Sequence, residues 1–124
     1  MKSIFYVLSL LILLFGLPGC EKEDKITLPD AEIVSITEVT ASTAKITTRV
    51  TDEGGSIVTG TGICWGDDPD PDLQDNVSNV GAGTGTFINI ITGLDNNTTY
   101  HVRAFATNSK GTAYSADRTF TTTR

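Results

Sequence analysis

The sequence predicts one all-β domain, a single antiparallel β-sandwich, and three observations carry that prediction. From about residue 28 onward, apolar or β-branched residues alternate with polar ones in short runs, the pattern of strands with one face in a core. Clusters of Gly, Asn and Asp separate the runs, and no segment offers a persuasive helical period. A chain of 124 residues has room for one such domain.

We expect six strands, covering residues 31–38, 43–51, 57–65, 86–91, 99–108 and 113–122. Residues 53–56, with two central glycines, predict a hairpin turn between the second strand and the third. In the second strand, alternation assigns to the core Ala44, Ile46, Thr48 and Val50. In the fifth, it assigns to the core Tyr100, Val102, Ala104 and Ala106. Phe105 then falls on the outer surface.

The fourth strand, residues 86–91, is ambiguous because both of its faces carry bulky apolar residues. Either Ile88 and Ile90 or Phe87 and Ile91 are exposed. An exposed apolar strip here, or Phe105 on the other sheet, is a candidate docking surface, and packing against another domain explains it equally well.

The N-terminus predicts export. Lys2 is followed by an apolar run over residues 4–16, which is shorter than the roughly 20 residues of a membrane-spanning helix. Pro18 and Gly19 would break a helix before it spanned, so a cleaved signal peptide is expected. Removing the first 19 of 124 residues leaves 105 and changes the net charge from −6 to −7, since Lys2 is lost. This acidic balance argues against nucleic acid as a partner.

Residues 17–20, Leu-Pro-Gly-Cys, resemble the bacterial lipobox, with Pro18 as a tolerated departure. The resemblance implies that Cys20 is acylated and becomes the first residue of the mature chain, which makes a membrane its partner through the lipid anchor. The expected division is a signal peptide at 1–19, an acylated tether at 20–29 and the sandwich at 30–124. An ordinary signal peptide with an incidental cysteine is the alternative.

Lys22, Glu23 and Asp24 resemble the short export signal of Bacteroidetes-type lipoproteins. That resemblance implies the outer membrane and its external face. A plain solvated linker explains the same charged run, so the face of the membrane is left open.

Residues 92–100 resemble the tyrosine corner of fibronectin type III domains, an immunoglobulin-like fold, with Leu94 six residues before Tyr100. The resemblance covers roughly residues 30–122 and implies that the Tyr100 hydroxyl meets a backbone group a few residues upstream. The usual tryptophan of the second strand is missing, and Trp65 stands at the end of the third instead. This variant resembles modules of Bacteroidetes surface lipoproteins. Ile63 and Trp65 are expected in the core, and Cys64, facing the other way, is expected to be an inert thiol without a disulfide partner.

An acidic run follows the third strand. Its carboxylates are the oxygen ligands that Ca²⁺ prefers, and they belong to Asp67, Asp68, Asp70, Asp72 and Asp75. An EF-hand is excluded because Leu73 stands where that loop requires Gly and Asn79 where it requires Glu. An irregular calcium site and a proline-stiffened loop kept soluble by charge both remain, and the second is favoured. No other cofactor is expected.

No catalytic constellation emerges. His101 is the single histidine, and no motif places a nucleophile or an acid around it. The glycine-rich residues 80–86 lead into a strand and lack the lysine of phosphate-binding loops. We therefore expect a non-enzymatic cell-envelope protein, a spacer or interaction module for a protein or glycan. The alternatives are a cation-dependent carbohydrate-binding module that uses residues 67–75, and the N-terminal part of a larger surface hydrolase or adhesin.

Overall fold

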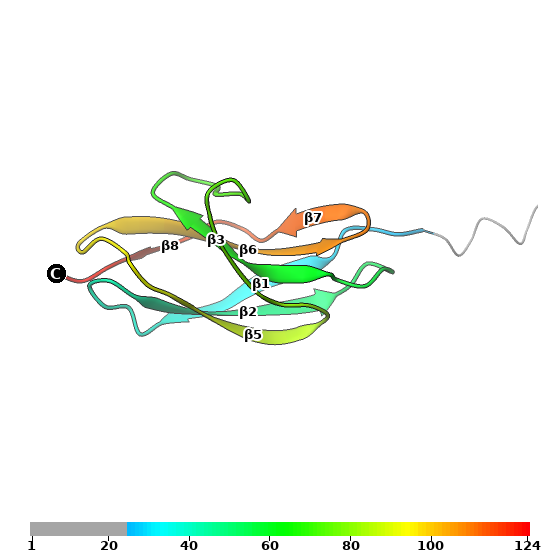
Figure 1. Cartoon of the computed structure of the whole chain (residues 1–124), viewed down its shortest axis with the longest axis horizontal. Helices are drawn as coiled ribbons and strands as arrows, with labels where there is room; N and C mark the ends of the chain where they lie inside the picture. Colours follow the sequence, from blue (N-terminus) through cyan, green and yellow to red (C-terminus); the bar gives the residue numbers. More distant parts are fainter. Residues whose placement is uncertain (1–24) are drawn as a thin grey trace, which may run out of the picture.

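The computed structural model describes residues 25–124 as two packed β-sheets, with no helix in that range (Figure 1). The strands are β1 (Asp30–Thr37), β2 (Ala44–Asp52), β3 (Gly60–Gly66), β4 (Asn76–Gly81), β5 (Gly85–Ile91), β6 (Thr99–Asn108), β7 (Gly111–Tyr114) and β8 (Arg118–Thr121). All pairings are antiparallel. The predicted fold class is confirmed.

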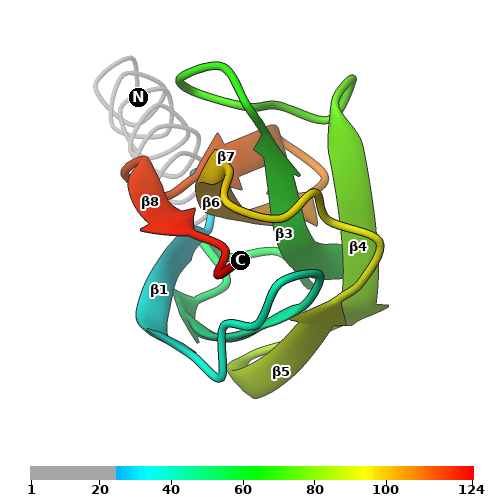
Figure 2. The same cartoon turned by 90° about the vertical axis from the view of Figure 1, so that its left-hand side faces the viewer.

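The first sheet, sheet A, has the order β1-β2-β5. Sheet B has the order β4-β3-β6-β7, and β8 continues beyond β7 along the same edge of β6. Figure 2 looks along the strands and shows the two layers facing each other. The described chain enters at one end of the sandwich and its C-terminus lies at the other (Figure 1).

The alternation read from the sequence is confirmed in the two central strands. All of the predicted core positions of β2 and β6 are buried, with Tyr100 the most exposed of them at 8%. Ile63 is fully buried, and Trp65 packs against the same apolar cluster. Alternation succeeds here because one face of each strand meets the other sheet and the opposite face does not.

The core consists of two apolar clusters, one around Ile46 and Val102 and a smaller one around Val50 and Val58. Three polar side chains are buried in the same interior: Thr48, Thr61 and Asn89. The Asn89 amide donates to the Ile46 carbonyl at 3.2 Å, while its Oδ1 has no partner among the described residues. Such an unpaired buried acceptor costs stability.

The observed strands differ from the expected ones in three places. Residues 76–81, where no strand was expected, form strand β4. The sequence did not reveal this strand, because the polar segment NVSNVG has little apolar alternation. The third strand begins at Gly60 instead of residue 57. The last predicted strand is divided into β7 and β8. Between them the Ser115 hydroxyl accepts a hydrogen bond from the Ala104 amide at 2.8 Å and replaces a ladder bond.

In β5 the structure shows which of the two apolar faces is exposed. Ile88 and Ile90 point to solvent, 56% and 64% exposed, while Asn89 and Ile91 are buried. The apolar strip therefore lies on the outer face of sheet A.

The start of the described chain is fastened to the domain. The Thr27 amide donates to the Gly54 carbonyl at 2.8 Å, and the Asn108 side chain donates to the Thr27 carbonyl at the same distance. Pro29 is buried. Residues 27–29, which the sequence assigned to the tether, thus pack against the ends of β2 and β6. Cys20, Lys22, Glu23 and Asp24 lie outside the described residues. No helix within residues 25–124 has the length and apolarity to cross a membrane.

Candidate functional site

The outer face of sheet B has a hollow along β3. Because Thr61 and Ile63 of β3 face the core, Gly60 and Gly62 face outward, and neither has a side chain to fill that surface. A Cβ on Gly62 would lie 1.8 Å from the Ser78 carbonyl oxygen of β4, so no other residue fits there. The glycines leave a trench between β4 and β6.

The expectation that Phe105 is exposed was wrong. Phe105 lies on the outer face, as alternation predicted, but it is only 3% exposed. Its partner across the ladder is Gly62, which leaves room for the aromatic ring, and Leu73 from the β3–β4 loop reaches the same place. The sequence could not show this because Leu73, which covers the ring, is 32 positions away in the chain.

The acidic loop, residues 67–75, folds back over this face. The Pro71 carbonyl accepts hydrogen bonds from the Arg103 guanidinium at 3.2 Å and from the Cys64 thiol at 3.4 Å. The Leu73 amide donates to the Tyr114 hydroxyl at 3.3 Å. Arg103 also stacks over the Tyr114 ring, 4.4 Å from its centroid. These contacts join the loop to β3, β6 and β7.

A second attachment point lies nearby. The Asp117 carboxylate accepts the Asp70 backbone amide at 2.8 Å and contacts His101 Nδ1 at 2.9 Å. Asp70 has a φ of 55°, in the left-handed region, so the loop bends sharply where it meets Asp117. His101, the single histidine, here helps to hold the loop in place.

The five aspartates predicted as possible cation ligands do not converge. Asp72 Oδ1 accepts the Gln74 amide and Asp75 Oδ2 accepts the Asp72 amide, at 2.8 and 2.9 Å, so these two carboxylates stabilise their own turn. Asp67, Asp68 and Asp70 are exposed. Within residues 25–124, no three His, Cys, Asp or Glu side chains are grouped so as to hold a metal ion. The calcium site stays a prediction.

Cys64 is enclosed between the sheet and this loop. Its side chain is fully buried and its thiol donates to the Pro71 and Arg103 carbonyls. Burial raises the pKa of the Cys64 thiol from 9.0 to about 11, against the opposing effect of the Arg103 charge. The group therefore stays protonated at neutral pH and is a poor nucleophile.

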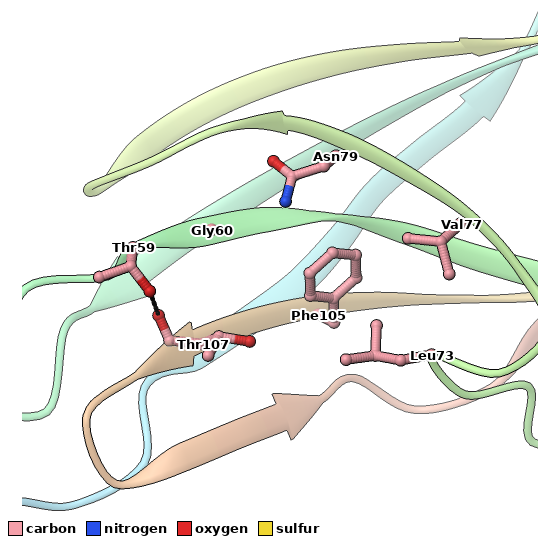
Figure 3. Close-up of a pocket in the computed structure, with 7 residues that line it drawn as sticks. All are labelled: Thr59, Gly60, Leu73, Val77, Asn79, Phe105 and Thr107. Atoms are coloured by element: carbon pink, nitrogen blue, oxygen red, sulfur yellow. Dashed lines mark hydrogen bonds between the residues drawn. The ribbon is translucent and has the colours of Figure 1, made fainter.

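Beside the docked loop a groove of about 420 Å³ remains open, and we call it the Phe105 groove. Figure 3 shows the residues that line it: Thr59, Gly60, Leu73, Val77, Asn79, Phe105 and Thr107. Leu73 and Val77 are each 41% exposed and supply apolar surface beside the aromatic ring. Two threonines and the Asn79 amide supply polar groups, and none of the lining residues is charged. Such a mixture suits an uncharged ligand with apolar and hydrogen-bonding parts.

The tyrosine corner lies at the end of the sandwich where the chain terminates. The Tyr100 hydroxyl accepts a hydrogen bond from the Asp95 amide at 2.8 Å, and the Tyr100 ring stacks on Phe120 with centroids 5.7 Å apart. Leu94 is buried beside them in the larger cluster. These residues stabilise the fold and contribute nothing to the groove.

The groove itself was not predicted from the sequence. Phe105 was predicted to lie at the surface, but no role in a binding site was assigned to Gly60, Gly62, Val77 or Asn79. The available signal was the spacing of Gly60 and Gly62, since two glycines on one face of a strand indicate a close approach by another part of the chain. β4, which supplies Val77 and Asn79, carries no comparable signal.

No protein-family model matches the sequence, and no curated protein matches it. Solved structures do match. The fourth fibronectin type III domain of a human protein is 16% identical with a TM-score of 0.58, over 86% of this chain and 87% of that one. The sensor domain of the anti-sigma factor RsgI4 of Pseudobacteroides cellulosolvens is 18% identical with a TM-score of 0.56, over 78% and 96%.

A third match is the sixth fibronectin type III domain of human fibronectin type III domain containing protein 3, 24% identical with a TM-score of 0.52, over 87% of this chain and 92% of that one. At these identities the likeness concerns the fold alone. The chain therefore has the fibronectin type III-like fold, an immunoglobulin-like sandwich, which is the class that its topology and tyrosine corner define.

Proposed function

We propose that this chain is a non-enzymatic, lipid-anchored module of the bacterial cell envelope, which binds a protein or glycan partner through the Phe105 groove. The observation that carries the proposal is the groove, an apolar hollow with uncharged polar groups at its border. The likeness to fibronectin type III and sensor domains supports an interaction module. Lipid anchoring rests on the sequence resemblance at residues 17–20.

The loop contacts support this choice of surface. A binding site performs best when its walls are fixed before the ligand arrives, because less conformational freedom is then lost on binding. Leu73 is held by the bond from its amide to Tyr114, and Pro71, two residues earlier, is held by Arg103. One wall of the groove is thus preorganised by contacts outside the groove.

An NMR titration of the ¹⁵N-labelled protein with a panel of neutral oligosaccharides and uncharged peptides tests the binding surface. A ligand of the groove should shift the amide signals of Val77, Asn79 and Thr107. Val77→Asp should abolish binding, whereas Ile57→Asp, at an exposed loop position, should retain it. A ligand whose shifts fall elsewhere, or whose affinity is unchanged by Val77→Asp, would rule out the groove.

The anchor is tested separately in cells. Wild-type protein should incorporate labelled palmitate and fractionate with membranes, and Cys20→Ala should lose both properties. Protease treatment of intact cells then distinguishes the two faces of the outer membrane, since a surface protein is digested. A soluble, unlabelled wild-type protein would contradict the anchor and leave the groove untouched.

The alternative, a cation-dependent carbohydrate module, is favoured by one observation, the density of carboxylates in residues 67–75. Addition of millimolar Ca²⁺ should leave the melting temperature unchanged, because the carboxylates do not converge and Asp72 and Asp75 stabilise their own turn. An increase of several degrees would favour the alternative, and Asp72→Asn should then remove it.

A further inference from the structure

The free edges of the two sheets differ in how well they are protected. An edge strand presents unpaired backbone groups, and proteins discourage pairing there with bulges, breaks and charges. β1 has two register irregularities and carries Asp30 and Glu32. The β7–β8 edge is interrupted between its two strands. β4 has an irregularity opposite Thr61 and Gly62.

β5 has none of these features. Its pairing with β2 runs from Gly85 to Ile91 without a register shift, and its sequence, GTFINII, has no charge and no proline. Sheet A ends at β5, so the second edge of this strand has no partner among residues 25–124. Figure 2 shows β5 at the border of its layer. It is a regular and unprotected edge.

The outer face of β5 adds apolar surface beside that edge. Ile88 and Ile90 are 56% and 64% exposed and lie side by side on one face of the strand. On the neighbouring strand, Lys45 and Arg49 form ion pairs with Glu38 and Glu32 at 3.3 and 2.6 Å. The two basic side chains that β2 presents beside Ile88 and Ile90 are therefore already paired with carboxylates.

We propose that β5 pairs with β5 of a second copy of this chain, in antiparallel orientation about a two-fold axis at Asn89. The axis places Ile88 opposite Ile90 of the other copy and Phe87 opposite its Ile91. The two copies of sheet A then form one continuous sheet of six strands, and four isoleucines gather on its outer face. This interface is separate from the Phe105 groove, which lies on sheet B.

A second copy suits this edge for a symmetry reason. When two identical strands pair about a two-fold axis, each side-chain contact occurs twice. The favourable contact between Ile88 of one copy and Ile90 of the other is therefore made at two places. The absence of charge means that self-pairing brings no like charges together. A partner strand with charged side chains would find no opposite charge on β5 to pair with.

Sedimentation velocity of the purified protein, in a detergent matched in density to the solvent, measures the association. An interface of one strand is small, so we expect a monomer–dimer equilibrium with a dissociation constant of about 10–500 μM. Ile90→Lys, a substitution that protects natural edges, should weaken the dimer at least about tenfold. Ile57→Lys is the matched control, because Ile57 is 70% exposed in a loop, and it should dimerise like the wild type.

Disulfide trapping tests the register. An Ile88→Cys variant mixed with a differently tagged Ile90→Cys variant should form mixed dimers on mild oxidation, and either variant mixed with Ile57→Cys should not. Cys64 is buried and provides little background. Monomers at every concentration up to about 1 mM would overturn the proposal, as would a dimer that Ile90→Lys leaves intact. Binding of a different protein at β5 by a monomeric chain would overturn it as well.

Discussion

Replacing Phe105 by Ala examines whether the outer face of sheet B contains a packed layer. The side chain is 3% exposed, and large-to-small changes at buried phenylalanines cost about 3–5 kcal/mol. Since one side of the ring borders the open groove, we expect the lower end, about 3 kcal/mol. An exposed phenylalanine, which alternation alone suggested, would lose less than about 0.5 kcal/mol.

Urea denaturation provides the measurement, with the fluorescence of Trp65, the single tryptophan, as the signal. With an m-value of about 1.5 kcal/mol/M, a loss of about 3 kcal/mol lowers the midpoint by about 2 M. Ile57→Ala, at a loop position that is 70% exposed, is the control and should leave the midpoint nearly unchanged. Equal midpoints for Phe105→Ala and Ile57→Ala would refute the packed layer and the docked loop with it.

Three further predictions concern single groups. Tyr100→Phe should cost about 1–2 kcal/mol in the same urea assay, because the Asp95 amide loses its acceptor while the ring packing stays. Gly62→Ala should cost about 3 kcal/mol or more, since its Cβ would overlap the Ser78 carbonyl, and a circular-dichroism melt like that of the wild type would contradict the close approach. The Cys64 thiol should resist a thiol reagent at pH 8 until urea unfolds the protein. The raised pKa stabilises the fold below pH 9.0, and this stability is lost as the pH rises to about 11, so Cys64→Ala should remove that part of the alkaline decline.

Much of the fold was readable from the sequence because the information was local. Period-two alternation placed the inward residues of β2 and β6, and the spacing of Leu94 and Tyr100 indicated the corner whose hydroxyl meets the Asp95 amide. β4 was missed because its polar residues do not alternate with apolar ones. The orientation of β5 stayed open for the opposite reason, since both of its faces are apolar.

The candidate site was less predictable because its parts come from distant segments. The loop that covers Phe105 was read as solvated, and its charges are indeed on the outside. What holds it down is the backbone, through the Pro71 carbonyl and the Asp70 and Leu73 amides. Backbone groups are the same in every sequence, so their pairing with Arg103, Asp117 and Tyr114 cannot be read from residue types.

By itself, the sequence determined the class of fold and the inward faces of the central strands, because both depend on the order of residues along each strand. It also determined that Cys64 has no disulfide partner within the domain, because the domain contains no second cysteine. Only the tertiary structure decided that Gly60 and Gly62 form a trench, that Phe105 fills part of it, and that Ile88 and Ile90 face solvent. Those outcomes depend on which distant segment lies across each face, and burial is a property of both partners.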